Sequence, residues 1–360
     1  MTELHNFKTL SEQQPEILDN LLTGNGFSRH FYDKFSYGSL YNFIKEQGKL
    51  EEKESKIFDD FKTANFEFVL NSLQSAMKIN NIFNLSTHEL NESYKKIKNL
   101  LIEAVNGIHP RKYRLKDANE LAWSFYIFKK NIFTTNYDLL SYWAITEIFA
   151  TQEQEYIGDY FKGYPLVFSP EQFNDFKMKV HYLHGALHLF DFDGDIGKIK
   201  TSSQDDILTT VTKMYSDDKF PIYVAEGSFR EKLIQIKRNR YLNYCYERLR
   251  EISGGITIIG QSLSEDYDKH IIDAINTSPV KHIAYGVYAT ENDPDTFIVE
   301  KIKRLFRKKE LHFFDSHTYF DELRKIAEQQ KDYKTFGYHD TFPKLPRPKT
   351  KKILNQSSTV

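Results

Sequence analysis

The chain has a single cysteine, Cys245, among its 360 residues. One cysteine excludes an internal disulfide framework, and it also excludes a zinc site of the four-cysteine kind. An excess of charge is absent as well, because 49 Lys and Arg residues are balanced by 50 Asp and Glu residues. No global electric field therefore attracts the protein to nucleic acid or anionic lipid, although a local basic patch could still do so.

Long hydrophobic runs are also missing. No stretch approaches the roughly 18 apolar residues of a membrane span, and the N-terminus shows no basic segment followed by an apolar run. We therefore expect a cytoplasmic protein without membrane contact, with which the scarcity of cysteine agrees. Hydrophobic residues make up 40% of the sequence, which is enough for a chain of 360 residues to form a full core without disulfides or metals.

Apolar runs of strand length alternate with segments of helical apolar spacing. Strands are predicted at residues 16–23, 131–136, 179–185, 220–227, 254–260, 281–289 and 310–316. Helices are predicted between several of them, at residues 137–150, 230–252, 266–276 and 294–309. Parallel strands need long crossovers, so this alternation predicts an α/β fold with a Rossmann-like, mostly parallel sheet and helices on both faces.

The domain organisation follows from a change of pattern in the first half. Residues 38–130 have helical spacing at residues 39–46, 65–79, 92–105 and 118–130, which predicts a mainly helical insertion. Residues 1–37 and 131–331 then form the α/β domain. Residues 332–360 lose periodicity and gather Pro, Lys and Ser, so we expect a flexible basic tail.

The insertion is a candidate lid or oligomer contact, because its aromatic residues Tyr37, Tyr41 and Phe43 closely follow the first loop of the α/β domain. Simple core packing explains these aromatic residues equally well. Two basic segments, at residues 301–309 and 344–352, could meet the phosphates of a nucleic acid. A solvated helix face and a solubilising tail are the favoured explanation for them, so no nucleic-acid partner is expected.

The first candidate loop contains Gly24, Asn25, Gly26 and Ser28 after an apolar strand. Backbone without Cβ atoms can approach a pyrophosphate and offer N–H groups there, although an ordinary strand-to-helix turn has the same pattern. A hydride-transferring dehydrogenase would add a third glycine and an acid at the end of a second strand. The segment that follows here is helical, which argues against that class.

The second candidate loop ends the strand at residues 131–136. Thr135, Asn136 and Asp138 place a hydroxyl, a carboxamide and a carboxylate where open α/β sheets bind ligands. Asn136 and Asp138 could equally cap the helix that follows, since both side chains accept hydrogen bonds from free N–H groups.

The third candidate loop is rich in histidine, at His181, His184 and His188. Side chains of a strand alternate between faces, so His181 and His184 should point to opposite sides and no shared metal ion is expected. We interpret His184, next to Gly185, as a general base at a cleft, with a structural histidine as the alternative.

The fourth candidate loop repeats the pattern of strand, glycine and hydroxyl, with Gly260 and Ser262 followed by an acidic helix start at Asp266. Ser264 in this segment could simply be a helix N-cap. The last strand ends at Asp315, where an adenine or ribose edge could be held.

Taken in order, the segments GNGFS, TTNYD, LHG and GQSLSxD resemble the NAD-binding segments of sirtuins, and more closely those of bacterial sirtuin-like NAD hydrolases of antiphage defence. The matches run from about residue 22 to about residue 270, and the last strand extends them to about residue 317. The resemblance implies that NAD is a substrate and that no metal is needed.

The resemblance also assigns roles to residues. It implies that the NAD phosphates lie against Gly24, Gly26 and Ser28, and that the adenosine half lies near Gly260 and Ser262. Further NAD contacts are expected at Asn25, Thr135, Asp266 and Asp315. The predicted catalytic residues are Asn136 and Asp138, which line the nicotinamide and ribose pocket, and His184, which is the base.

Two departures from the sirtuin pattern bear on activity. Sirtuin deacylases carry a four-cysteine zinc module, which is impossible with Cys245 alone, and a segment GIPDFR after the first loop. Here that segment contains Asp33 and Phe35 but no matching Arg. We therefore expect NAD cleavage by water, with nicotinamide and ADP-ribose as products, rather than deacylation of a protein.

Two alternatives remain from the sequence. One is a non-catalytic sensor that binds NAD or another nucleotide, and the other is an NAD-dependent protein deacylase. If the defence-type likeness holds, uncontrolled loss of NAD would kill the host. The expected protein is therefore a homo-oligomer or is restrained by a partner, for which a defence-associated ATPase is a family-level expectation.

Overall fold

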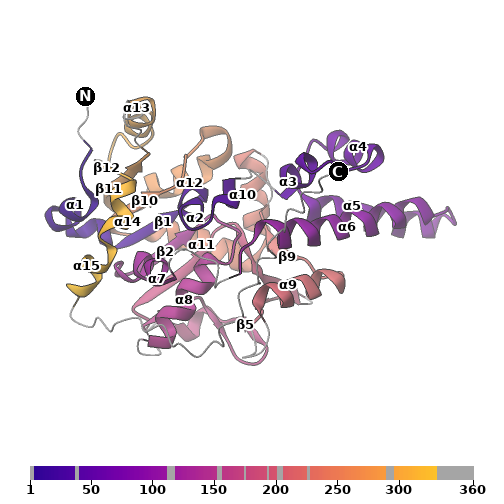
Figure 1. Ribbon diagram of the computed structural model, residues 1–360, viewed down its shortest axis with the longest axis horizontal. Coiled ribbons are helices and arrows are strands. Elements are labelled where there is room, and N and C mark those ends of the chain that lie inside the picture. The colour runs from indigo at the N-terminus through magenta and orange to yellow at the C-terminus, as the bar shows by residue number, and fades with distance from the viewer. Residues whose placement is uncertain are drawn as a thin grey trace, which may run out of the picture.

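The predicted α/β fold is confirmed by a computed structural model, which describes residues 4–36, 40–111, 118–151, 156–173, 176–192, 194–200, 206–224, 228–288 and 296–330. Within these ranges a parallel sheet of seven strands has the order β12-β11-β10-β1-β2-β6-β3 (Figure 1). In chain order these strands are β1 (Asn20–Thr23), β2 (Asn131–Thr134), β3 (Ile157–Gly158), β6 (Met178–Tyr182), β10 (Gly254–Ile259), β11 (Val280–Val287) and β12 (Glu310–Asp315).

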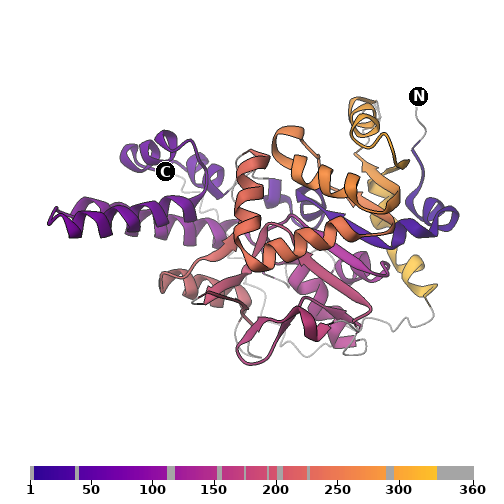
Figure 2. The same ribbon diagram turned by 180° about the vertical axis from the view of Figure 1, so that it is seen from behind.

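Helices cover both faces of this sheet, as parallel sheets require. One face carries α7 (Ala118–Tyr126), α8 (Leu140–Thr151) and α15 (Leu323–Glu328), with α7 in contact with the other two (Figure 1). The opposite face carries α10 (Phe229–Arg238), α11 (Arg240–Glu251) and α12 (Glu265–Thr277), which contact one another (Figure 2). The remaining helices of the α/β body are α1 (Phe7–Gln13), α2 (Asn25–Phe31), α9 (Ile207–Ser216), α13 (Thr296–Leu305) and α14 (His317–Asp321), with short 3₁₀ turns η1 (Pro15–Leu18), η2 (Asp33–Ser36) and η4 (Pro170–Phe173).

One strand and one helix were predicted with the wrong extent because of local signals at Pro15 and Asn239. The strand predicted at residues 16–23 begins only at Asn20, because Pro15 starts the 3₁₀ turn η1 and its fixed φ suits the first position of a helical turn. The helix predicted at residues 230–252 is two helices. Asn239 lies between them in an extended conformation, and its side chain accepts hydrogen bonds from the first N–H groups of α11.

The predicted strand at residues 220–227 is not part of the parallel sheet. Within it the structure describes one strand, β9 (Pro221–Tyr223), which belongs to a second, antiparallel sheet of order β4-β5-β8-β7-β9. The other strands of that sheet are β4 (Phe161–Lys162), β5 (Leu166–Phe168), β7 (Gly185–Phe192) and β8 (Asp195–Lys198). The strand predicted at residues 179–185 therefore ends at Tyr182, and Gly185 begins a strand of the other sheet.

The predicted helical insertion contains α3 (Leu40–Glu46), α4 (Glu52–Asp60), α5 (Phe66–Ile82) and α6 (His88–Ile108). These helices project from the α/β body as an arm, with α5 and α6 side by side (Figure 1). Helix α7 was predicted within the insertion but packs on the body. Tyr41 and Phe43 are buried, whereas Ile82 and Phe83 at the turn between α5 and α6 are 76% and 69% exposed.

The predicted tail at residues 332–360, the basic segment at residues 344–352 and Tyr37 lie outside the described residues. Within the ranges that the structure covers, no helix combines the length and the apolar character needed to cross a bilayer.

Two glycines allow a test of how closely the start of β7 approaches β9. Gly185 has φ +83°, and a Cβ atom there would lie 1.8 Å from the carbonyl oxygen of Ile222, whereas Gly194 has φ +93° with open space around it. We expect Gly194→Ala to lower the free energy of unfolding by about 1–2 kcal/mol, the cost of the left-handed backbone alone. Gly185→Ala should cost a further 1–3 kcal/mol or so, because overpacking is added. Urea unfolding of both variants measures the difference, and equal costs would contradict the close approach.

Candidate active site

The carboxyl ends of β1, β2, β6 and β10 meet at one edge of the sheet. Thr23 at the end of β1 pairs with Ile259 of β10 on one side and with Thr134 of β2 on the other, and Tyr182 of β6 pairs with Thr134. The chain runs outward from β1 through β2 and β6, then resumes at β10 and runs the opposite way. The boundary between β1 and β10 is therefore the topological switch point, where open α/β sheets bind ligands.

The glycines of the first and fourth loops contact one another at this switch point. A Cβ atom at Gly26 would lie 2.7 Å from the Cα atom of Gly260, and one at Gly260, which has φ +68°, would lie 2.1 Å from the nitrogen of Phe27. The N–H of Gly26 donates to the carbonyl of Gly260 over 2.8 Å. This N–H is therefore already used within the protein, and the two glycines serve first to join the loops.

The first loop is not a free loop but the start of a helix, since α2 begins at Asn25. The Asn25 side chain is exposed and donates to the carbonyl of Phe35 over 3.1 Å. Ser28 lies one turn into the helix on its inward face and is fully buried. Of the predicted phosphate contacts, Asn25 and Gly26 are at the surface, while Gly24 and Ser28 face the protein interior.

The structure brings three predicted site residues into one hydrogen-bond network. The Ser28 hydroxyl donates to Asp138 Oδ2 over 2.5 Å. Asn136 Nδ2 donates to Ser28 Oγ over 2.8 Å and to the carbonyl of Gly24 over 2.9 Å. Because both amide hydrogens are used within the protein, the side-chain carbonyl of Asn136 is the atom that remains to orient a ligand or a water molecule.

Asp138 is buried and receives two hydrogen bonds. Its Oδ1 accepts from the N–H of Leu140 over 2.8 Å, which confirms the capping interaction at the start of α8, and its Oδ2 accepts from Ser28. Burial raises the pKa of Asp138 above its ordinary value, and the bonds from Ser28 and Leu140 oppose that shift. The carboxyl group holds Ser28, and through it Asn136, in place.

Thr135 joins the second loop to the fourth. Its hydroxyl lies 3.3 Å from the carbonyl of Thr23 and 3.2 Å from Oε1 of Gln261. Gln261 was not among the predicted site residues, although it stands inside the motif GQSLS. A Cβ atom at Gly24 would lie 2.6 Å from the carbonyl oxygen of Gly260 and 2.8 Å from Cα of Gln261, so the backbone of the fourth loop requires glycine there.

His184, the predicted base, follows the end of β6 and has a histidine partner. Its Nε2 lies 3.0 Å from Nε2 of His270 on α12, and both rings are buried. One of these nitrogens must donate and the other accept, so at least one imidazole keeps its proton on Nε2. Nδ1 of His270 is shielded from solvent and has no hydrogen-bond partner among the described residues.

The histidine pair is neutral at physiological pH. Burial, with smaller contributions from His270 and Lys232, holds the pKa of His184 well below its ordinary value. Burial and Lys232 lower the pKa of His270 to about 3. A neutral imidazole can accept a proton, but a depressed pKa makes it a weak base until a ligand changes its surroundings.

The other two histidines of the third loop lie elsewhere. His181 lies within β6, where its Nε2 is 3.1 Å from Oδ1 of Asn131, the first residue of β2, and its ring stacks on Phe133. His188 is fully buried in β7 between the rings of Tyr142 and Tyr182. His181, His184 and His188 therefore occupy three separate environments. His184 contacts His270, and no hydrogen bond among the described residues joins it to Ser28, Asn136 or Asp138.

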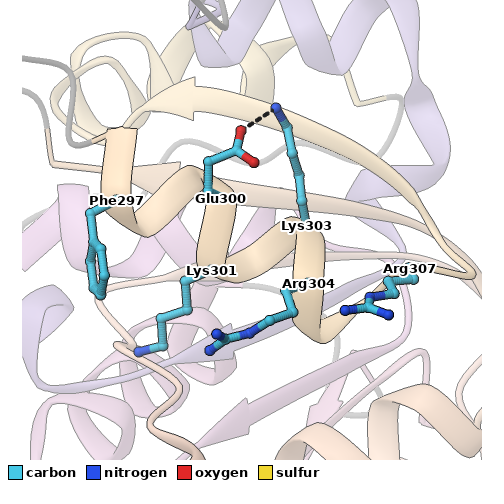
Figure 3. A pocket seen from close by; sticks show the side chains of 6 residues that line it. All are labelled: Phe297, Glu300, Lys301, Lys303, Arg304 and Arg307. Atoms are coloured by element: carbon cyan, nitrogen blue, oxygen red, sulfur yellow. Dashed lines mark hydrogen bonds and ion pairs between the residues drawn. The ribbon is translucent and has the colours of Figure 1, made fainter.

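The predicted contacts for adenosine lie on the other side of the switch point. Ser262 is exposed, and its carbonyl accepts from Lys301 of α13 over 2.9 Å. Lys301 and Arg304 of α13 point to one side, as does Arg307 just after the helix, and Phe297 lines the same hollow (Figure 3). This basic helix face adjoins the fourth loop, which also receives an ion pair from Arg304 to Glu265 at 2.8 Å.

Two predicted acids sit at the margin of the cluster. Asp266 is exposed in the first turn of α12, whereas Asp268, which the sequence analysis passed over, is buried and accepts from the N–H of Ser264 over 3.0 Å. Asp315 ends β12 and accepts from the N–H of His317 over 2.9 Å. Three strand spacings separate β12 from β1, about 14 Å, so Asp315 could meet only the far end of an extended ligand.

A hollow of about 670 Å³ lies between the arm and the α/β body, and its walls include Phe58 and Lys62 from the arm and Lys232 and Tyr267 from α10 and α12. Lys232 Nζ is 4.0 Å from Asp268 Oδ1 at the start of α12. A hollow of this volume is typical of sites for small molecules. The arm therefore forms one wall of a space that reaches α12, the helix that carries His270.

His109 connects the arm to the second loop. It follows the last residue of α6, and its Nε2 accepts from the N–H of Leu139 over 2.9 Å while Nδ1 lies 2.9 Å from the carbonyl of Pro110. Burial lowers the pKa of His109 to about 4, so the ring is a neutral acceptor. This contact ties the base of the arm to the residue next to Asp138.

Sequence reasoning missed His270, Gln261 and His109. A helical wheel of residues 266–276 would have placed His270 on the buried face with Ala274, four residues later. Gln261 stood within a quoted motif. His109 lay in the insertion, where no pattern indicated a contact with the second loop.

The family described as "Domain of unknown function (DUF4917)" matches residues 21–319 of the chain. No curated protein matches it. The matched range begins in β1 and ends in α14, so it includes the arm and every candidate site residue.

The buried histidines make stability depend on pH. Their pKa values are depressed in the folded state, so below about pH 6.5 the unfolded chain binds more protons and stability falls by about 1.4 kcal/mol per pH unit for each histidine. Replacing His270 with Gln removes one such group. We expect the loss of unfolding free energy between about pH 6 and pH 5 to shrink by roughly 1 kcal/mol.

Urea unfolding at several pH values measures this slope. His88→Gln is the matched control, because His88 is exposed on the arm. If His270→Gln and the unaltered chain lose the same unfolding free energy between about pH 6 and pH 5, the pKa of His270 is not depressed in the folded protein.

Proposed function

The chain belongs to the DUF4917 family, and we propose that it is an NAD hydrolase that cleaves the bond between nicotinamide and ribose. The products are nicotinamide and ADP-ribose. The observation that supports the proposal most strongly is the network of Ser28, Asn136 and Asp138 at the switch point of the sheet. We infer that NAD is the substrate because the four loops resemble those of sirtuin-like NAD hydrolases.

NAD would extend along the edge of the sheet. Its nicotinamide and ribose would lie near Asn136 and His184, and its adenosine half would lie towards Ser262 and the basic face of α13. The phosphates would meet the start of α2, where the helix N-terminus favours anions. Because the N–H of Gly26 is already used, Asn25 and the basic side chains of α13 would carry more of this contact than the glycines.

The reaction needs little acid or base strength. Nicotinamide in NAD is a cationic pyridinium, so it leaves with the bonding electron pair as a neutral molecule while positive charge builds on the ribose. Water then bonds to the anomeric carbon, and its proton passes to His184. The enzyme mainly orients the substrate, excludes bulk water and positions the attacking water molecule.

Each residue has a distinct task in this mechanism. The free carbonyl of Asn136 orients the water or a ribose hydroxyl. Asp138 acts through Ser28 as a positioning residue, since it does not reach the ligand directly. His270 fixes the orientation of His184 through the bond between their Nε2 atoms, and it can relay a proton only if one ring changes tautomer.

A second candidate function is a nucleotide sensor without catalysis. The engagement of His184 by His270, together with its depressed pKa, favours this alternative because the base is held in a form that accepts protons weakly. A protein deacylase has less support, since the segment after α2 has no Arg after Phe35 and Cys245 is the only cysteine.

The biological setting follows from the same resemblance and stays a proposal. NAD depletion in antiphage defence would require restraint of the enzyme until infection. A homo-oligomer or an ATPase partner could supply it through the arm, whose base is tied to the second loop by His109. The cytoplasm is the compartment that this role implies.

The first test is the release of nicotinamide from NAD, followed by chromatography, with protein alone and in lysate of phage-infected cells. We expect Asn136→Ala and His184→Ala each to lower turnover by roughly 10²–10⁴-fold. The matched controls are Asn106→Ala and His88→Ala, which change exposed residues of the arm. Unchanged turnover in both site variants would refute the assignment.

Binding of NAD, measured by calorimetry beside the turnover assay, separates the alternatives. NAD binding without nicotinamide release in either condition would favour the sensor. Nicotinamide release that depends on an acylated peptide would favour the deacylase.

A further inference from the structure

Two histidines and a glutamate come together far from the candidate active site. His282 lies near the start of β11, and Glu310 and His312 lie at the start of β12, the edge strand of the parallel sheet. The strand-end loops lie at the other ends of these strands. The cluster is therefore separate from the proposed NAD site.

The strand register places all three side chains on one face. His282 pairs directly with Glu310, and paired residues of parallel strands point to the same side. His312 is two residues after Glu310, so it returns to that side as well. The arrangement follows from the backbone and not from chance orientations of long side chains.

The ligand atoms are close to the spacing of a metal site. His282 Nδ1 lies 3.4 Å from one oxygen of Glu310, and His312 Nε2 lies 3.6 Å from the other. One atom from each residue can be chosen so that all three lie within 4.8 Å of one another. Ligand atoms around a tetrahedral zinc ion with bonds of about 2.05 Å are roughly 3.4 Å apart.

The imidazole nitrogens in the cluster are otherwise unused. His282 Nδ1 and His312 Nε2 are shielded from solvent and form no hydrogen bond with any described residue. Buried polar atoms normally have a partner, and orphaned ones often indicate an ion that completes the site.

We propose that His282, Glu310 and His312 bind a zinc ion. Two imidazoles and a carboxylate are a ligand set that zinc accepts, with a water molecule or a fourth side chain completing the tetrahedron. The exposed His5 is the candidate fourth ligand, because its backbone pairs with Phe313 and Asp315 along the outer edge of β12. The ion would join β11, β12 and the N-terminal segment.

This site differs from the expectation of no metal that the sequence analysis gave. The one sequence signal was the spacing of Glu310 and His312 on a single strand, with His282 arriving from 28 positions earlier. Sequence spacing alone cannot show that these strands are neighbours. The four-cysteine zinc site remains excluded, since the proposed ligands are of a different kind.

The test uses the full chain with any affinity tag removed, freed of metal by a chelator. Calorimetric titration with zinc chloride should give one site, and mass spectrometry should find one zinc per chain after gel filtration. His312→Ala and Glu310→Gln should each weaken binding by more than about 10-fold. The matched control is His88→Ala, which removes an exposed histidine beside Glu89 and should bind zinc like the unaltered chain.

Cobalt(II) gives an independent readout of geometry. The intense visible absorption of tetrahedral cobalt should appear in the unaltered chain and be lost in His282→Gln, a change that keeps the residue polar and of similar size. Failure of the unaltered chain to bind zinc would overturn the proposal, as would equal zinc affinity in His312→Ala. NAD cleavage is not part of either measurement, so its outcome does not affect this one.

Discussion

The contact between the loops after β1 and β10 is the constraint on which the rest of the site depends. The chain segments that follow two neighbouring parallel strands must either diverge or pack against each other. Here the segments after β1 and β10 pack through backbone atoms of Gly26 and Gly260. Gly26 lies against Gly260, and an added Cβ atom on either side would collide with the other loop. This contact fixes the start of α2, and α2 in turn places Ser28 against Asp138.

Burial then gives the polar groups of the site their properties. Ser28, Asp138 and His184 are all shielded from water, so each needs a protein partner to offset the loss of solvation. Asp138 has Ser28 and Leu140, Asn136 has Ser28 and Gly24, and His184 has His270. These partners hold the buried side chains in place before any ligand arrives, as preorganised sites require. His184 and His270, which form a separate pair, are neutral because charging them without solvent is costly.

The arm is joined to this centre at its base. Its helices form one wall of the hollow beside α10 and α12, and His109 at the end of α6 bonds to the backbone next to Asp138. A displacement of the arm would therefore act on the second loop and on the hollow together. Its outer turn carries two exposed apolar residues, Ile82 and Phe83.

The sequence by itself determined the α/β class, the approximate positions of the strands of the parallel sheet other than β3, which was not predicted, and the loops that carry Asn136, Asp138 and His184. These features are local, since apolar periodicity and strand-end glycines lie within a few residues of one another. Only the tertiary structure decided which strands are neighbours, that β9 joins a second sheet, that Gly26 supports Gly260, and that His184 meets His270. Those contacts join residues far apart in the chain. They depend on which surfaces of the folded chain can be buried against each other, and a short sequence pattern does not contain that information.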